Sequence, residues 1–363
     1  MKKTLTVLFV LFIFGFAAAS ILLPDTLFSP MENRNLAQMP DVTWDGVVSG
    51  EFEQSFETAF ADQFPLRNLW IGMKSVSEGI LGKRENNGVY VCKDRLIEAI
   101  EMPDAERIDQ NIRLVNRFAE SCEVPVYFTL IPTAALVYAD ELPQGAPVCD
   151  ERTWIGCISE NVNAEIIDTV SALENGENDL FYRTDHHWTS KGASLGAKAA
   201  AEAMGETLAA EYESVTVTEE FYGTLYSKAG RWSVKPDTIE IYVPQDGITV
   251  THIENGEETE GTLYDYDRLS EKDKYAFFMG GNQPLAVVKT GHEGKKLLLV
   301  RDSYADSEIP FLCEAFSEIH VADLRYFKTG LLTYIEENGI DEVLISYSIR
   351  NFMTDTNLAF MAR

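Results

Sequence analysis

The sequence predicts an α/β fold, in which helices cover both faces of a largely parallel sheet. Helical patterns alternate with short apolar strands in two stretches of the chain, residues 104–204 and 296–347. The strand at 296–300 is apolar without interruption after its first residue, which is typical of a strand buried on both faces. With 363 residues, 45% of them hydrophobic, the chain can bury a large core.

A membrane segment is expected at residues 1–24. Lys2 and Lys3 precede an apolar run from Leu5 to Ala19, which resumes at residues 21–23 and so approaches the ~20 residues that span a bilayer. Small residues at 17–20 also suit signal peptidase, so both an uncleaved anchor and a cleaved signal peptide are open. The basic N-terminus places the rest of the chain outside the cytoplasm, either membrane-anchored or secreted.

Residues 25–48 are expected to form an extended arm or linker, because they are polar and contain prolines. The folded domain is expected to cover residues 49–363. It begins with a helical hairpin joined near Pro65, whose apolar side chains recur at helical spacing and are expected in the core. These side chains are Phe52, Phe56, Phe60, Leu66, Leu69, Trp70 and Met73.

The α/β elements follow in order. Asp104 caps a helix that leads to a strand at 124–131, and then come a helix at 162–173, a strand at 180–182 and a helix at 194–204. Residues from about 211 to 288 alternate β-branched and polar side chains, which predicts a β-rich, largely antiparallel insertion and a possible lid. The pattern resumes with strands at 296–300, 319–321 and 342–347, and with helices at 308–316 and 331–337.

Charge and cysteine content exclude some functions. Thirty Lys and Arg residues against 58 Asp and Glu give a formal charge of −28, which repels phosphate backbones, so no nucleic-acid partner is expected. The five cysteines form no C-x-x-C pair. Cys149 and Cys157 bracket a short loop and could form a disulfide in an oxidising compartment, while buried thiols are an equal alternative for the others.

The chemistry is expected at two places, Asp185-His186-His187-Trp188 and Ser303. Ser303 directly follows an apolar strand and precedes a helix, where backbone N–H groups can stabilise an oxyanion. A serine nucleophile needs a base, and the base needs a carboxylate to orient it. On an extended segment residues i and i+2 face the same side, so Asp185 is expected to orient His187, with His186 pointing away and Trp188 packing beside them.

Two alternatives remain for this cluster. Asp185, His186 and His187 could bind a metal, but adjacent residues on an extended segment diverge, and the other three histidines lie near no second ligand motif. They could also be held by ordinary polar contacts. No metal and no cofactor are expected, apart from an acyl donor of unknown identity.

The sequence resembles the DHHW protein family, which is similar to the alginate O-acetyltransferase proteins of the SGNH-hydrolase-like group. Beside the stretch from Thr184 to Thr189, the resemblance is carried by short motifs along most of the chain. These are Glu32-Asn33-Arg34 with Leu36 and Pro40, Phe64-Pro65-Leu66-Arg67, Ile131-Pro132, Asp302-Ser303 and Asp323-Leu324-Arg325. The resemblance implies an SGNH-hydrolase-like fold.

In the alginate relatives the pattern is Asp-x-His-Trp with a later Gly-Asp-Ser, so the implied triad is Asp185, His187 and Ser303. This sequence departs from the pattern at Arg301, where those relatives have glycine. The substitution puts in doubt whether the backbone before the serine keeps the same conformation, and hence how well the oxyanion hole is formed. Candidates for holding the oxyanion are the Ser303 amide and Asn282 in Gly280-Gly281-Asn282, an ordinary turn being the alternative. Candidates for holding a substrate anion are Arg325 and Arg350, which could equally form surface ion pairs. Trp188, beside the cluster, is a further candidate for substrate contact.

The resulting hypothesis is an extracytoplasmic carbohydrate O-acetyltransferase or acetylesterase that works through an acyl-enzyme. Its partners would be a cell-surface or exported polysaccharide and the membrane, with a membrane-bound acyl-transfer partner also conceivable. The alternative hypothesis is a non-catalytic cell-envelope protein that binds or assembles polysaccharide, and Arg301 is the residue that keeps this alternative open.

Overall fold

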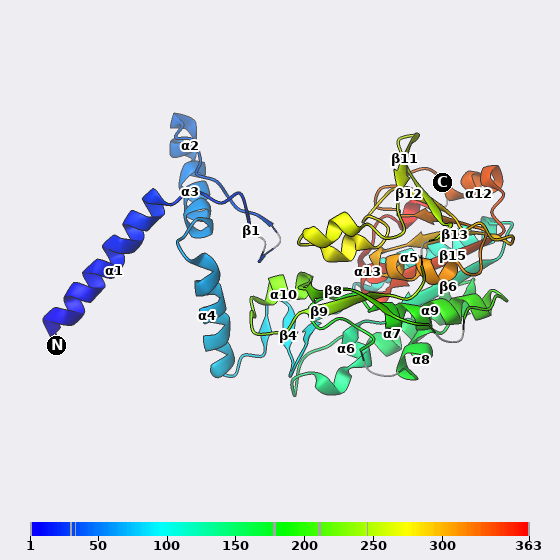
Figure 1. The fold of residues 1–363 in the computed structure, drawn as a ribbon, viewed down its shortest axis with the longest axis horizontal. Helices are drawn as coiled ribbons and strands as arrows, with labels where there is room; N and C mark the ends of the chain where they lie inside the picture. Colours follow the sequence, from blue (N-terminus) through cyan, green and yellow to red (C-terminus); the bar gives the residue numbers. More distant parts are fainter. Residues whose placement is uncertain are drawn as a thin grey trace.

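In the computed structural model, an α/β body is preceded by a helical N-terminal arm that stands to one side of it (Figure 1). The structure describes residues 2–29, 31–32, 34–176, 179–209, 212–244 and 246–361. Pro30 and Asn33 of the predicted arm, and Glu211 at the predicted start of the insertion, lie outside the described residues.

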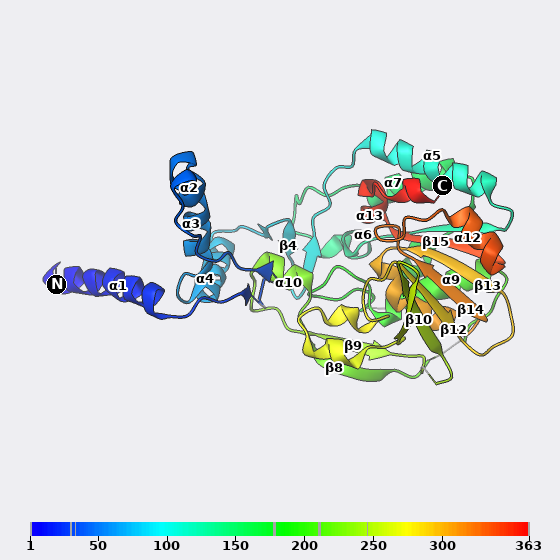
Figure 2. The same cartoon turned by 90° about the horizontal axis from the view of Figure 1, so that it is seen from above.

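A mixed sheet forms the centre of the body, as seen from above in Figure 2. Among the described residues it has eight strands in the order β11-β10-β12-β14-β13-β15-β6-β7. Neighbouring strands from β14 to β7 run parallel, whereas β12, β10 and β11 continue the sheet antiparallel. The parallel strands are β14 (Glu318–Ala322), β13 (Lys296–Arg301), β15 (Glu342–Ser348), β6 (Val126–Ile131) and β7 (Glu165–Ile167).

Helices cover both faces of the sheet, as predicted. On β13, Leu297 and Leu299 face one buried cluster while Leu298 and Val300 face the other, which is why the strand is apolar at successive positions. One cluster contains side chains of α8 (Thr169–Glu174), α9 (Ser190–Ala203) and α11 (Ile309–Leu312). The other contains those of α5 (Ala105–Ser121), α7 (Glu151–Asn161), α12 (Leu331–Asn338) and α13 (Ile349–Thr354).

Small residues let α9 approach the body closely. Thr189 caps this helix by accepting a hydrogen bond from the Gly192 amide. A Cβ atom at Gly196 would lie 2.6 Å from the Trp188 ring, and one at Gly192 would lie 2.3 Å from the Leu180 carbonyl oxygen. The small residues of this helix therefore allow the large indole to be buried beneath it.

Two predicted elements are wrong. Residues 162–173 form strand β7 and the short helix α8, because Asp168 caps a new helix by accepting from the Ser171 amide. Residues 180–182 form no regular strand but contribute a single bridge between Phe181 and Trp188, so this segment is one side of a tight loop. The sequence prediction also omitted α7.

The β-rich segment divides between two places. Strands β8 (Val215–Phe221) and β9 (Asp237–Ile241) pair with each other, and α10 (Thr224–Ala229) lies between them in the chain. Strands β10 (Thr249–Glu254), β11 (Glu257–Gly261) and β12 (Leu285–Lys289) instead join the central sheet. Two short 3-10 helices, η2 (Tyr266–Ser270) and η3 (Lys274–Phe277), connect β11 to β12.

The first helix, α1 (Lys2–Leu22), is the candidate membrane segment. Lys3–Leu22 is long and apolar enough to cross a bilayer by length and composition, and none of its most apolar window is buried in the fold. Near its end, the Phe16 ring stacks on Phe64 at 5.5 Å and also contacts Trp70. The helix therefore meets the hairpin that follows it.

The segment that contains β1 (Phe28–Ser29) and β2 (Arg34–Asn35) is fixed to this hairpin by ion pairs, one of which joins two of the motifs that carried the family resemblance. The two strands form a small ribbon. Arg34 donates to both Asp62 carboxylate oxygens, and Arg67 pairs with Glu32. The hydrogen bond from Arg34 lowers the pKa of Asp62 to about 2. Glu32, Arg34 and Ala37 are therefore held against the hairpin, where an extended arm or linker was expected.

The hairpin aromatics are not in the core, so that prediction is wrong. Helices α2 (Trp44–Ser49), α3 (Glu51–Asp62) and α4 (Arg67–Ile80) stand beside the body (Figure 1). Phe56 is 42% exposed and Phe60 41%, and Leu69 and Met73 are more exposed still. The apolar period correctly predicted helices, but it cannot show whether the same chain supplies a partner for their apolar side.

A second, smaller sheet joins the hairpin to the body. It contains β3 (Glu85–Asn86), β4 (Val89–Val91) and β5 (Leu96–Glu98) and packs on α10. The disulfide that the sequence allowed between Cys149 and Cys157 is absent from the structure, in which Cys149 is a buried free thiol and Cys157 an exposed one. Cys149 packs among the apolar side chains between the sheet and the outer helices.

Candidate active site

Ser303 stands at the carboxyl end of β13, at the start of the 3-10 helix η4 (Ser303–Ser307). The preceding residue, Asp302, holds this turn in place. One of its carboxylate oxygens accepts the Tyr304 amide at 3.0 Å, and the other accepts the Ser348 amide, the Ser348 hydroxyl and the Asn351 side chain. The carboxylate thereby ties the turn after β13 to the turn after its neighbour β15.

Asp185 and His187 lie on the loop between residues 180 and 188. The buried Asp237 of β9 organises this loop, because its carboxylate accepts the Arg183 amide, the Thr184 amide and the Thr184 hydroxyl. Burial raises the pKa of Asp237 to about 6, and the three hydrogen bonds oppose the shift. The β8–β9 pair therefore supports the loop that carries Asp185 and His187 from outside the central sheet.

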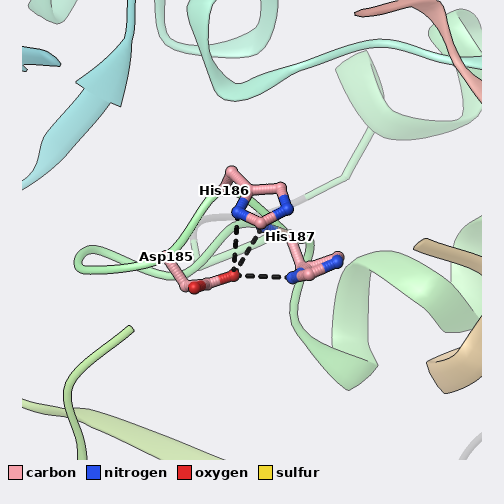
Figure 3. Close-up of side chains that lie close together, drawn as sticks. All are labelled: Asp185, His186 and His187. Atoms are coloured by element: carbon pink, nitrogen blue, oxygen red, sulfur yellow. Dashed lines mark hydrogen bonds and ion pairs between the residues drawn. The ribbon is translucent and has the colours of Figure 1, made fainter. Parts of the chain in front are cut away.

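A continuous line of hydrogen bonds joins the two predicted places. Asp185 Oδ1 lies 2.6 Å from His187 Nδ1, and His187 Nε2 lies 2.8 Å from Ser303 Oγ. Figure 3 shows dashed lines from one oxygen of the Asp185 carboxylate to both histidines, whose rings lie next to each other. The structure thus brings together the three residues predicted to form the triad, across 116 residues of chain.

The Asp185 carboxylate is fully engaged. Oδ1 also accepts the His187 amide, and Oδ2 accepts the Thr224 amide at 2.7 Å and the Thr224 hydroxyl at 3.0 Å. Burial alone would raise the pKa of Asp185, but the two histidines and these hydrogen bonds hold it well below its usual range. The group is therefore a permanent anion that can orient and stabilise a charged imidazole.

Tyr275 holds the other side of His187. Its ring stacks face to face on the imidazole, with centroids 3.7 Å apart and planes 4° from parallel. Its hydroxyl donates to the Ser303 carbonyl oxygen at 3.1 Å and lies 3.1 Å from the Ser307 hydroxyl. The 3-10 helix η3, in the segment predicted as an insertion, thus supplies a residue that touches two members of the triad.

Sequence reasoning missed Thr224, Asp237 and Tyr275. Thr224 lies 39 residues from Asp185 and Asp237 lies 54 residues from Arg183, while Tyr275 comes from η3, still later in the chain. Over such separations no strong local pattern marks them as neighbours. Gly223 gives a weak signal, because a glycine before a short helix leaves room for another segment to approach closely.

His186 was expected to point away from His187, but it lies against it. Its ring lies 3.9 Å from that of His187, and its Nδ1 is 2.8 Å from the Thr224 hydroxyl and 3.5 Å from Asp185 Oδ1. The i, i+2 argument holds for an extended strand, but this loop turns tightly enough to stack successive rings. Burial lowers the pKa of His186 to about 4.

The same turn bears on the metal alternative. Ligand atoms of Asp185, His186 and His187 lie within 4.8 Å of one another. The argument against a metal, that adjacent side chains on an extended segment point apart, therefore does not apply to this loop. However, Asp185 Oδ1 and His187 Nδ1 are bonded to each other, and His187 Nε2 faces Ser303. A cation between them would have to displace the hydrogen bond that orients the imidazole.

Trp188 is fully buried, and its Nε1 donates to the Tyr304 carbonyl oxygen at 2.7 Å. It had been named among the candidates for substrate contact, but its side chain is covered by α9 and supports the Ser303 turn from below. Tyr304 in turn donates to the His186 carbonyl oxygen at 2.6 Å. This pair of bonds fixes the histidine loop against the serine turn.

Arg301 is accommodated without backbone strain. It ends β13 in regular parallel pairing with Ser346, a conformation that does not require glycine. Its buried guanidinium lies 2.9 Å from Asp306, 3.3 Å from Asp323 and 3.1 Å from the Asn282 side-chain oxygen. The departure from the Gly-Asp-Ser pattern therefore adds a buried charge network beside the serine turn and leaves the strand intact.

The remaining candidates have partners. Asn282 Oδ1 accepts from both Arg301 and Arg325, which turns its NH2 group away from these two cations. Arg325 is bidentate on Asp323, and although burial alone would lower its pKa, Asp323 raises it. Arg350 pairs with Glu98 at 3.2 Å. Both arginines therefore form ion pairs, which was the alternative considered for them.

A methyl group at Gly223 should disturb the triad. A Cβ atom there would lie 2.3 Å from Asp185 Cβ and Oδ2, so Gly223→Ala must displace the carboxylate. We expect overpacking to cost about 1–3 kcal/mol of unfolding free energy, together with a large loss of turnover. Gly156→Ala is the control, since nothing lies within 4 Å of a Cβ atom there. Thermal unfolding and acetyl-ester turnover of both variants test this, and equal behaviour would contradict it.

Comparison with known proteins agrees with this geometry. Residues 93–265 match the family described as "SGNH hydrolase-like domain, acetyltransferase AlgX". The chain is 23% identical over 171 residues to a probable alginate O-acetylase, AlgJ, of Pseudomonas putida, and a Pseudomonas fluorescens counterpart is 21% identical over 174 residues. These matches cover 44% of this chain and 44% of each relative, so less than half of the relatives' length is matched.

Solved structures extend the likeness to about three quarters of the chain. A DHHW family protein from Eubacterium siraeum is 26% identical, with a TM-score of 0.64, covering 76% of this chain and 95% of that one. PatB1 of Bacillus cereus, in a structure with a sulfonyl adduct, has the same fold at 19% identity and a TM-score of 0.64, covering 75% of this chain and 98% of that one. The predicted resemblance and the SGNH-like α/β fold are confirmed.

Proposed function

We propose that this chain, a relative of the SGNH hydrolase-like acetyltransferases, is a carbohydrate O-acetyltransferase or acetylesterase that works through an acyl-enzyme. The observation that carries the proposal is the line of hydrogen bonds from Asp185 through His187 to Ser303, at 2.6 and 2.8 Å. Such a line is what activates a serine that is otherwise a weak nucleophile. The related sequences support acetyl transfer as the reaction class.

The first half-reaction forms the acyl-enzyme. Ser303 Oγ attacks the carbonyl carbon of an acetyl ester while His187 Nε2 takes the hydroxyl proton. Asp185 keeps Nδ1 protonated and stabilises the imidazolium. The Ser303 amide and the Asn282 side-chain NH2 are the proposed donors to the oxyanion. When the tetrahedral intermediate collapses, His187 returns the proton to the leaving oxygen and acetyl-Ser303 remains.

The second half-reaction runs the same steps in reverse. A sugar hydroxyl or a water molecule gives its proton to His187 Nε2 and attacks the acetyl carbonyl. Ser303 Oγ then leaves and takes the proton back, which yields an acetylated sugar or free acetate. The choice between transfer and hydrolysis depends on which of the two acceptors reaches the imidazole, so both activities follow from one site.

The site is proposed to work outside the cytoplasm, at a membrane. Lys3–Leu22 has the length and composition of a membrane span and follows a basic terminus. This location suits a cell-surface or exported polysaccharide as acceptor. It also allows a membrane-bound partner to deliver the acyl group, with no cofactor or metal in the reaction. Nucleic acid is not expected to bind, given the net charge of −28.

A covalent probe separates an enzyme from a polysaccharide-binding protein of the same fold. Phenylmethylsulfonyl fluoride should sulfonylate Ser303 of the full chain in detergent, because only an activated serine displaces fluoride readily. Intact mass and peptide mapping should show the adduct on wild type and none on Ser303→Ala or His187→Ala. An unlabelled wild type that retains a polysaccharide would favour the non-catalytic alternative. Labelling that persists in His187→Ala would refute the proposed base.

A further inference from the structure

A groove lined by cations lies beside the catalytic loop, in a chain that is otherwise strongly acidic. It has a volume of about 670 Å³ and lies between the β3–β5 sheet, the loop after α10 and the start of β9. We call it the basic groove. Five cationic side chains line it: Arg84, Lys93, Arg183, Arg231 and Lys235. It is large enough for a ligand of several rings.

These cations exceed the carboxylates near them. Two acidic residues, Asp94 and Glu141, also line the groove. Glu141 is already paired with the buried Arg95 at 3.1 Å. Arg183 is also engaged, since it lies 3.1 Å from Asp179 outside the groove lining and 3.8 Å from Asp94. A site that gathers five cations in a chain of net charge −28 is not explained by overall composition.

Three of the five are available to a ligand. Arg84, Lys93 and Lys235 are exposed, and within the described ranges their side chains form no ion pair. Bringing like charges together around a hollow costs free energy unless an anion is shared between them. Since the Debye length is about 8 Å at physiological salt, the local cations rather than the distant acidic residues decide what enters.

The groove is connected to the triad through the backbone. The Arg183 amide donates to Asp237, and its carbonyl oxygen accepts the Leu96 amide of β5 at 2.8 Å. Asp185 follows two residues later. At the other end of β5, Glu98 bridges Lys228 and the candidate Arg350.

We propose that the basic groove binds the carboxylate or phosphate groups of an anionic glycan, and so anchors the acceptor beside the catalytic loop. The role as acceptor rests on the proposed function, whereas the binding itself does not. Shared recognition by several lysines and arginines suits both anions, because carboxylates and phosphates each accept charge-assisted hydrogen bonds. A neutral glycan would find no partner for these charges.

Binding is tested apart from catalysis, on the full chain carrying Ser303→Ala. Trigalacturonate supplies carboxylates, a glycerol phosphate trimer supplies phosphodiesters, and maltotriose is the neutral probe. In calorimetric titrations at low salt, one or both anionic probes should bind and maltotriose should not. Lys93→Gln with Lys235→Gln should weaken that binding about five- to tenfold, since two exposed charge contacts are lost. Added salt should weaken it further.

The matched control removes two charges elsewhere. Arg113 and Arg117 are exposed on α5 and line no part of the groove, so Arg113→Gln with Arg117→Gln should leave the affinity unchanged. Equal weakening by both double variants would reduce the effect to net charge and overturn the proposal. So would absence of binding by either anionic probe, or equal binding of maltotriose. If these probes bind but wild type shows no Ser303-dependent turnover, the groove stands and the proposed enzyme falls.

Discussion

Replacing Ser303 by alanine should lower acetyl-ester turnover by on the order of a thousandfold or more, with the fold unchanged. Ser303 Oγ is the atom that His187 Nε2 faces at 2.8 Å, and no other hydroxyl is hydrogen-bonded to that nitrogen among the described residues. The side chain is small, and alanine fits the same 3-10 turn because Asp302, not Ser303, caps it. The loss should therefore be chemical rather than structural.

The measurement is release of 4-nitrophenol from 4-nitrophenyl acetate by the full chain in detergent. Ser159→Ala, on the outer helix α7, is the control that makes the same change away from the site. Circular dichroism and thermal unfolding should show both variants folded. Turnover of Ser303→Ala within tenfold of wild type would end the proposal that this serine carries the acyl group.

Asp185→Asn should cost on the order of ten-thousandfold in kcat, as the same change does in the serine-protease triad. The reason lies in how the carboxylate is used. One oxygen accepts from His187 Nδ1, and the other accepts the amide and hydroxyl of Thr224. Asparagine has a single acceptor, so if its oxygen faces Thr224, its NH2 group faces Nδ1. The imidazole must then carry its proton on Nε2, where it cannot accept one from Ser303.

Asp109→Asn is the matched control, since Asp109 is exposed on α5 and the charge change is identical. The steady-state rate with 4-nitrophenyl acetate should fall in Asp185→Asn with little change in KM, because the group acts on the base and not on substrate binding. A variant that keeps more than a tenth of the wild-type kcat would show that Asp185 does not set the tautomer of His187.

The α/β body was predictable because its strands are buried on both faces. Leu297 to Val300 alternate between two cores, and a run of this kind fits few other environments. The predicted helix boundaries were wrong where a capping residue interrupts the hydrophobic period. Asp168 is such a residue, because it caps a new helix inside the predicted one. The antiparallel half of the sheet was read as an insertion because β10 and β11 are polar on their exposed side, like any edge hairpin.

The hairpin shows a different limit. Phe56 and Phe60 follow the helical period, yet they are exposed on α3, outside the body. Periodicity reports that one side of a helix is apolar, and it does not identify what covers that side. Only the tertiary structure shows that the core does not cover these side chains. In it, α3 stands beside the body and is held to β2 by the pair of Arg34 and Asp62.

The sequence alone identified Asp185, His187 and Ser303 as a candidate triad, since Asp185 and His187 are local neighbours and Ser303 follows its strand directly. These relations depend on backbone geometry over a few residues, which a short motif can encode. Only the tertiary structure decided what holds the triad in place, because Thr224, Asp237 and Tyr275 arrive from elements far along the chain. It also stacked His186 on His187 and joined the basic groove to the catalytic loop, because such contacts arise only when distant segments pack together.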